Sequence, residues 1–143
     1  MTRRIILSAI AVSVSLGFAA ARAKASDADK IDWLLDAIAH LESNHYSHAV
    51  GDGGRAIGTY QIHKRYWRDG TRFLDVDWSY DQAKDPVKAR KVVRAYLLHY
   101  GKGKTLLQKA RIHNGGPRGY RKTATLKYAR KIARILDQAD GES

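Results

Sequence analysis

Apolar residues recur at intervals of three and four through much of this chain, the periodicity of helices with one buried face. The first such stripe begins after Asp27 and consists of Ile31, Leu34, Leu35, Ile38 and Leu41. It predicts a helix that Asp27 or Asp29 caps and that ends between Asn44 and Ser47.

Three further helices are expected in the second half of the chain. Asp85 and Pro86 form a helix start, and Gly101 ends the apolar face that follows. A shorter helix over residues 106–112 stops at residues 113–117. The last helix opens at Thr123 or Thr125, and its inward face is expected to contain Leu126, Ala129, Ile132, Ala133 and Leu136.

The segment between these helices has a different pattern. Residues 51–54 read Gly-Asp-Gly-Gly and predict a turn, whereas residues 56–62 alternate weakly and predict a short hairpin. Residues 63–68 are expected to form a short helix, and residues 71–81 a connection without a clear period. The prediction is therefore a mainly α (α+β) fold, with a small β-hairpin and a cleft between two lobes.

The N-terminal residues are typical of a secretory signal peptide. Arg3 and Arg4 precede an uncharged, mostly apolar run over residues 5–18, and small residues follow up to Ala25. A membrane anchor is the alternative, but the run is shorter than the roughly 20 residues that a spanning helix needs. We therefore expect a signal peptide over residues 1–25, a catalytic domain over residues 26–143, and a periplasmic or secreted protein without stable membrane insertion.

The net charge limits the classes of partner that the protein can bind, and the cysteine count bears on how the fold is stabilised. The formal net charge is +12 and falls to +8 without residues 1–25. An exported basic protein meets carboxylate-rich cell-wall polymer more than nucleic acid, although helical spacing of Lys and Arg is also typical of a solvated face. The chain has no cysteine, so its core must suffice without disulfides. We expect a monomer with no nucleic-acid partner.

Two carboxylates are candidates for catalysis. Glu42 follows Leu41 at the end of the first apolar stripe, where burial would raise its pKa and suit it to general-acid work. Asp52 follows ten positions later in the glycine-rich turn. A glycosidase needs such a pair. The alternatives are an exposed helix-terminal glutamate and an ordinary Asp-Gly turn.

Other residues could hold a saccharide. Tyr60 supplies an aromatic ring and Gln61 an amide, although Tyr60 is equally suited to core packing. His113, Asn114 and Gly115 stand at a helix end, where glycine permits a ligand to approach the backbone. A plain helix C-cap would explain the glycines but not the histidine and asparagine.

Metal and cofactor chemistry is not indicated. His40, His45 and His48 cross a predicted helix end, and no His-Glu-x-x-His pattern exists. The chain also lacks a Gly-x-Ser-x-Gly elbow and a phosphate-binding Gly-x-x-x-x-Gly-Lys-Ser/Thr loop. We expect neither a metal nor a cofactor.

Two blocks of residues resemble the lysozyme superfamily. Leu41-Glu42-Ser43 with residues 51–62 and Tyr66-Trp67 forms the first, and residues 110–117 with 125–128 form the second. Together they are similar to invertebrate-type (destabilase-like) lysozymes and, more loosely, to soluble lytic transglycosylases. The resemblance implies a lysozyme-like fold and cleavage of the β-1,4 bond between N-acetylmuramic acid and N-acetylglucosamine.

The resemblance also implies roles for individual residues. Glu42 matches the catalytic acid, whereas Asp52 lies near the second carboxylate with an offset of one residue. Gln61, His113 and Asn114 match groove-lining positions, and the expected substrate-binding set is completed by Ser43, Tyr60 and Gly115. The absence of cysteine departs from the disulfide-rich family, and no residue argues for isopeptidase activity.

Three alternatives remain open at this point. A lytic transglycosylase needs only Glu42, as acid and then base, and forms 1,6-anhydromuramic products. A non-catalytic cell-wall-binding module would use the basic surface alone. Hydrolysis of chitin would use the same residues on a polymer without muramic acid.

Overall fold

The computed structural model describes the backbone of residues 27–141 and the side chains of residues 30–139. The predicted signal peptide lies outside the described residues. Five α-helices are described: α2 (Asp27–Ser43), α3 (Lys64–Leu74), α4 (Pro86–Tyr100), α5 (Leu106–Gly115) and α6 (Leu126–Gly141). Four short 3₁₀ helices connect them: η1 (Asp52–Gly54), η2 (Tyr80–Lys84), η3 (Gly119–Arg121) and η4 (Thr123–Thr125).

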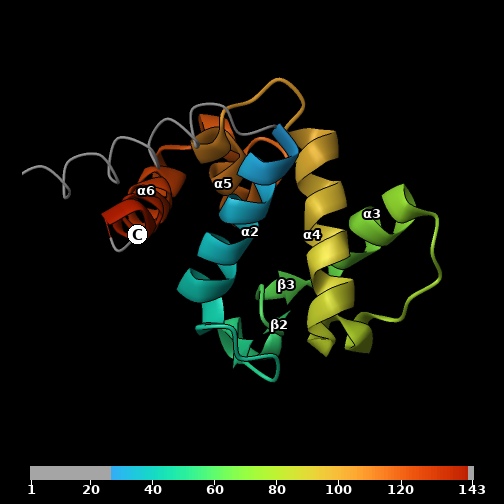
Figure 1. Cartoon of the computed structure of the whole chain (residues 1–143). Coiled ribbons are helices and arrows are strands. Elements are labelled where there is room, and N and C mark those ends of the chain that lie inside the picture. Colours follow the sequence, from blue (N-terminus) through green and yellow to red (C-terminus); the bar gives the residue numbers. More distant parts are fainter. Residues whose placement is uncertain (1–26, 142–143) are drawn as a thin grey trace, which may run out of the picture.

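A small antiparallel sheet accompanies the helices. Its strands are β1 (Val50–Gly51), β2 (Ala56–Ile57) and β3 (Ile62–His63), in the order β1-β2-β3. The sheet lies near the C-terminal end of α2, while α2 and α4 run side by side through the centre (Figure 1). The mainly helical fold with a small β element is confirmed. In residues 27–141 no helix combines the length and apolarity needed to cross a membrane.

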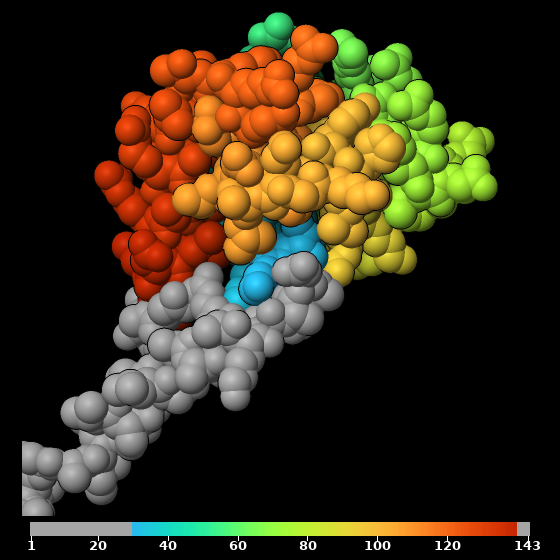
Figure 2. Space-filling model, turned by 90° about the horizontal axis from the view of Figure 1, so that it is seen from above, coloured from blue at the N-terminus to red at the C-terminus, as the bar shows by residue number. Residues whose placement is uncertain are grey.

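The helices α3 and α6 lie at opposite ends of the molecule. In Figure 1, α3 and α6 are separated by α2 and α4, and Figure 2 shows the residues of α5 between them. The core joins both ends, because the buried faces of α2, α4 and α5 belong to one cluster. Its fully buried side chains include Leu34, Ile38, Val92, Leu97 and Ile112.

The observed helix boundaries show which local sequence signals predicted the helix ends correctly. Asp85 caps α4 as predicted, since its carboxylate accepts hydrogen bonds from the backbone N–H groups of Val87 and Lys88. Helix α5 continues to Gly115, so the predicted end at residue 112 was three residues too early. Leu126 was expected to face inward, but it is exposed at the first turn of α6.

The region after the sheet is more regular than predicted. Helix α3 extends to Leu74, where Asp75 adopts a left-handed conformation and ends it. Residues 80–84 then form η2, which Ser79 and Gln82 begin with a reciprocal capping box. The polar residues of this stretch interrupt the apolar period from which helices are predicted. Within α3, one of them, Thr71, donates a hydrogen bond from its hydroxyl to the Trp67 carbonyl.

The hairpin prediction was incomplete, because a third strand pairs with it. Val50 lies opposite Ile57, and Ile57 lies opposite Ile62. Each strand contains only two residues, which is too short for a clear alternation in the sequence. Gly58 lies between β2 and β3 at a φ of 79°, and a Cβ there would stand 2.2 Å from the Ala83 carbonyl oxygen. The sheet thus packs closely against η2.

Candidate active site

Glu42 lies where three helices meet. It occupies the last turn of α2, and its side chain is 21% exposed. Its Oε1 accepts a hydrogen bond of 2.8 Å from the Tyr128 hydroxyl of α6. His113 of α5 places its Nε2 3.6 Å from the same oxygen. One carboxylate oxygen is therefore held by two residues that are distant in the sequence.

His113 is itself held in a fixed orientation. Its side chain is 3% exposed, and its Nδ1 lies 3.1 Å from the Tyr66 hydroxyl of α3. Tyr66 stacks on Tyr96 of α4 with the ring centroids 3.6 Å apart. Because both rings are buried, the imidazole has little freedom to turn away from Glu42.

The pKa of Glu42 moves in the direction opposite to the sequence prediction. Burial acts to raise it, and this is the largest single effect. The hydrogen bonds from His113 and Tyr128, with the positive charges of His113 and His63, together outweigh burial and hold the pKa below its ordinary value of 4.5. The prediction from an apolar helix face was wrong because these donors lie elsewhere in the chain.

The partner of Glu42 is a stable donor. Burial and the nearby Glu42 carboxylate both raise the pKa of Tyr128 far above its usual range. The Tyr128 hydroxyl is therefore protonated at neutral pH, where it donates to Glu42.

Asp52 lies in η1 and is paired. Its side chain is 44% exposed, its Oδ1 lies 2.7 Å from Nη2 of Arg55, and its Oδ2 lies 3.2 Å from Nε2 of His63. The charge of His63 also lowers the pKa of Glu42. His63 thus contacts Asp52 directly and acts on Glu42 through its charge.

The three predicted binding residues near the sheet contact the protein itself. The Ser43 hydroxyl donates to the Thr59 carbonyl (2.8 Å), and the Gln61 amide donates to the Ala49 and Gly58 carbonyls (3.2 and 3.0 Å). Tyr60 is 3% exposed, which favours the core-packing alternative. These contacts join the end of α2 to the sheet, and substrate binding by the three residues stays a prediction.

The other predicted group lies in the last turn of α5. His113 faces Glu42, whereas Asn114 is exposed. Gly115 accepts a hydrogen bond of 2.6 Å from Lys122, and a Cβ at this position would stand 2.6 Å from the Thr125 methyl group. Close packing against η4 therefore accounts for this glycine.

Comparisons with known proteins find similar lysozymes. No protein-family model matches the chain. It is 40% identical over 85 residues to a lysozyme of Magallana gigas and 46% identical over 81 residues to one of Ostrea edulis, which covers 54% and 52% of this chain. The matches span 58% of the length of each oyster protein.

A solved structure extends the likeness over more of the chain. A crystal structure of Meretrix lusoria lysozyme in complex with Aeromonas hydrophila PliI matches with a TM-score of 0.63 and 32% identity. The match covers 72% of this chain and 88% of that one. The chain belongs to the invertebrate-type lysozyme family.

Within this lysozyme fold, sequence reasoning missed three residues that surround Glu42. Tyr128 and Tyr66 both stand in the blocks that resemble the family but received no role. His63 directly follows the Gln61-Ile62 pair. For the two tyrosines, position inside the matching blocks was the available signal, and His63 lies next to such a block. The contacts of all three residues depend on the tertiary fold.

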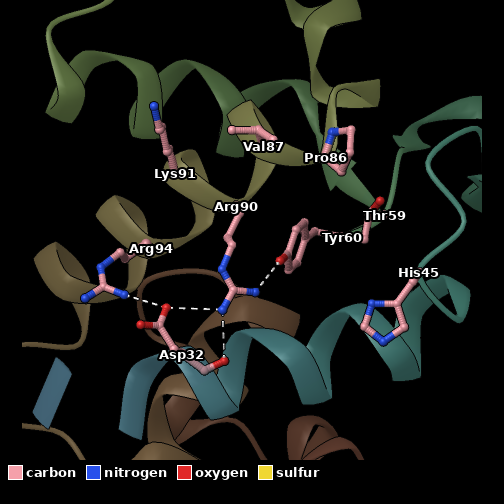
Figure 3. A pocket seen from close by; sticks show the side chains of 9 residues that line it. All are labelled: Asp32, His45, Thr59, Tyr60, Pro86, Val87, Arg90, Lys91 and Arg94. Carbon is pink, nitrogen blue, oxygen red and sulfur yellow. Dashed lines mark hydrogen bonds and ion pairs between the residues drawn. The ribbon is translucent and has the colours of Figure 1, made fainter. Parts of the chain in front are cut away.

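A depression between the two central helices of this family member is lined by residues other than Glu42. Among residues 27–141 no group of three or more His, Cys, Asp or Glu side chains is arranged to hold a metal ion. A depression of about 510 Å³ lies between α2 and α4 (Figure 3). There the Arg90 guanidinium joins Asp32, Asp36 and the Tyr60 hydroxyl, so the network fastens the two central helices.

Proposed function

We propose that this protein is a lysozyme that hydrolyses the peptidoglycan bond between N-acetylmuramic acid and N-acetylglucosamine. The observation that carries the proposal is the Glu42 carboxyl group, mostly buried where α2, α5 and α6 meet and contacted there by Tyr128 and His113. Membership of the lysozyme family supports the substrate. The charged N-terminal start and the apolar run after it support export, so the wall is the polymer within reach.

Glu42 must carry a proton when the glycosidic oxygen leaves. In the free protein its pKa is low, so the carboxyl group is ionised at neutral pH. A bound saccharide covers the exposed fifth of the side chain and strengthens the burial effect, which favours the neutral form.

Asp52 supplies the second carboxylate. Arg55 and His63 hold its two oxygens, and this fixes the carboxylate in place. A preorganised carboxylate of this kind stabilises the positive charge that develops on the sugar ring.

The decisive experiment measures clearing of purified peptidoglycan by the wild type and by Glu42→Gln. We expect the variant to lose at least about 100-fold in rate, because it has no proton to donate. Asp137→Asn, an equal charge change at an exposed position of α6, is the matched control and should clear normally. Equal rates for the wild type and Glu42→Gln would refute the catalytic assignment.

The products identify the reaction. Hydrolysis leaves a reducing muramic acid end. Detection of a 1,6-anhydro end by mass spectrometry would instead show that the enzyme is a lytic transglycosylase. Binding without clearing by the wild type would instead indicate the non-catalytic wall-binding module.

A further inference from the structure

A second depression lies outside the surroundings of Glu42. It has a volume of about 550 Å³ and runs between α3 and the extended segment over residues 76–80. Basic side chains of α3 form one wall, and Trp78, Tyr80 and Asp77 form the other. Nothing in the catalytic arrangement uses these residues.

The α3 wall carries an excess of positive charge. Lys64, Arg65 and Arg68 are all exposed, and Asp77 is the carboxylate that faces them across the depression. Among the described residues the one ion pair of these cations joins Arg68 to Asp69, with 3.9 Å between Nε and Oδ1. At that distance and exposure the pair contributes little, so the cations remain available to a ligand.

The opposite wall is aromatic and rigid. The Trp78 carbonyl accepts a hydrogen bond of 2.9 Å from the indole of Trp67 in α3. The Tyr80 hydroxyl donates to the carbonyls of Ile62 (2.7 Å) and Arg55 (3.0 Å). These bonds fasten the wall to β3 and to the end of η1, so the depression exists without a ligand.

One end of the depression adjoins the loop that carries Asp52. The Tyr80 hydroxyl in one wall donates to the carbonyl of Arg55, whose guanidinium pairs with Asp52. Lys64 in the other wall directly follows His63, whose Nε2 lies 3.2 Å from the Asp52 carboxylate. A peptide attached to a sugar that is bound beside Asp52 is therefore nearest to this end of the depression.

We propose that this depression binds the carboxylate-bearing peptide stems of the glycan strand that Glu42 cleaves. Their carboxylates pair with Lys64 and Arg68, and their small apolar side chains pack on Trp78. The inference rests on the proposed function and makes peptide-bearing wall polymer the preferred substrate over bare glycan.

The test compares two polymers with and without the basic wall. Peptide-bearing glycan strands and the same strands stripped of peptide by an amidase are offered to the wild type and to Lys64→Ala/Arg68→Ala. We expect the wild type to show the higher kcat/KM on the peptide-bearing strands. The double variant should lose about tenfold there and keep its rate on stripped strands.

A matched variant distinguishes the loss of this site from a general loss of positive charge. Lys131→Ala/Arg134→Ala removes the same charge from exposed positions of α6, at the opposite end of the molecule (Figures 1 and 2). It should keep the preference for peptide-bearing strands. Equal losses for the two double variants, or a wild type without any preference, would overturn the proposal.

Binding gives an answer that does not depend on turnover. In the Glu42→Gln background, calorimetry should show that the Lys64→Ala/Arg68→Ala substitutions weaken the Kd for peptide-bearing strands alone. An unchanged Kd would overturn the peptide site. By contrast, full clearing activity of Glu42→Gln would refute the proposed catalytic function and leave the Kd comparison valid.

Discussion

The residues that contact Glu42 decide how readily its carboxyl group holds a proton. The imidazole Nε2 of His113 is 3.6 Å from the carboxylate, and the Tyr66 hydroxyl fixes the other ring nitrogen. Burial, the largest single effect, raises the pKa of Glu42. The contacts with His113 and Tyr128 favour the ionised carboxylate and, with the charge of His63, outweigh burial.

His113→Gln should move the alkaline limb of the kcat/KM profile to higher pH. The substitution removes the hydrogen bond and charge of His113 that lower the pKa of Glu42, so this pKa rises. The carboxyl group of the variant therefore keeps its proton to higher pH than that of the wild type. Tyr66→Phe keeps the contact between His113 and Glu42, and its profile should be lower in height but unshifted. A uniform loss across pH in His113→Gln would assign a purely structural role.

Asp52→Asn should cost about 3–4 kcal/mol of transition-state stabilisation, because the fixed negative charge beside the sugar is removed. Asp75→Asn is the control, since both aspartates have a left-handed backbone, with φ of 49° and 53°, that asparagine tolerates. Rates on purified peptidoglycan measure the difference. A near-normal Asp52→Asn rate would mean that Glu42 acts alone, as in the transglycosylase reaction.

At the scale of elements, the sheet packs on η2 through direct contact between the two backbones. Gly58 brings β2 against the Ala83 carbonyl, and the hydroxyl of Ser43 ties Thr59 to the end of α2. The two contacts set the position of the sheet relative to the helix that carries Glu42. A displacement of the sheet would therefore also strain the end of α2, where Glu42 lies.

Two glycine substitutions separate crowding from backbone strain. Gly53 and Gly58 both have positive φ, 63° and 79°, but a Cβ at Gly53 meets nothing within 4 Å. Gly53→Ala should lower the unfolding free energy by about 1 kcal/mol from strain alone. Gly58→Ala should cost roughly 3 kcal/mol or more, because the Ala83 backbone must move. Denaturant unfolding measures both, and equal losses would contradict close packing of the sheet on η2.

The elements of this protein differ in how far local patterns predict them. The helix α2 and the start of α4 follow from apolar spacing and from the Asp85-Pro86 cap, both of which are local. The two-residue strands have no readable period, and polar residues mask η2 and the end of α3. Short elements are specified by their neighbours more than by their own sequence.

At the scale of the whole molecule, the candidate active site is assembled from distant segments. Tyr128 stands 86 residues after Glu42, so its hydrogen bond follows only from the packing of α6 on α2. Glu42 could be singled out as a candidate from its setting and from the family resemblance. The sign of its pKa shift could not, because burial and charge oppose each other and their balance depends on three-dimensional distances.

The shortness of the strands has a consequence for how copies of this protein meet one another. In the described sheet, β1 and β3 are the edges, and each offers only two residues of backbone to a neighbour. A strand of a second molecule finds no extended template there, even though Val50 is 63% exposed. The small sheet thus completes the fold while avoiding the edge-to-edge association that begins aggregation.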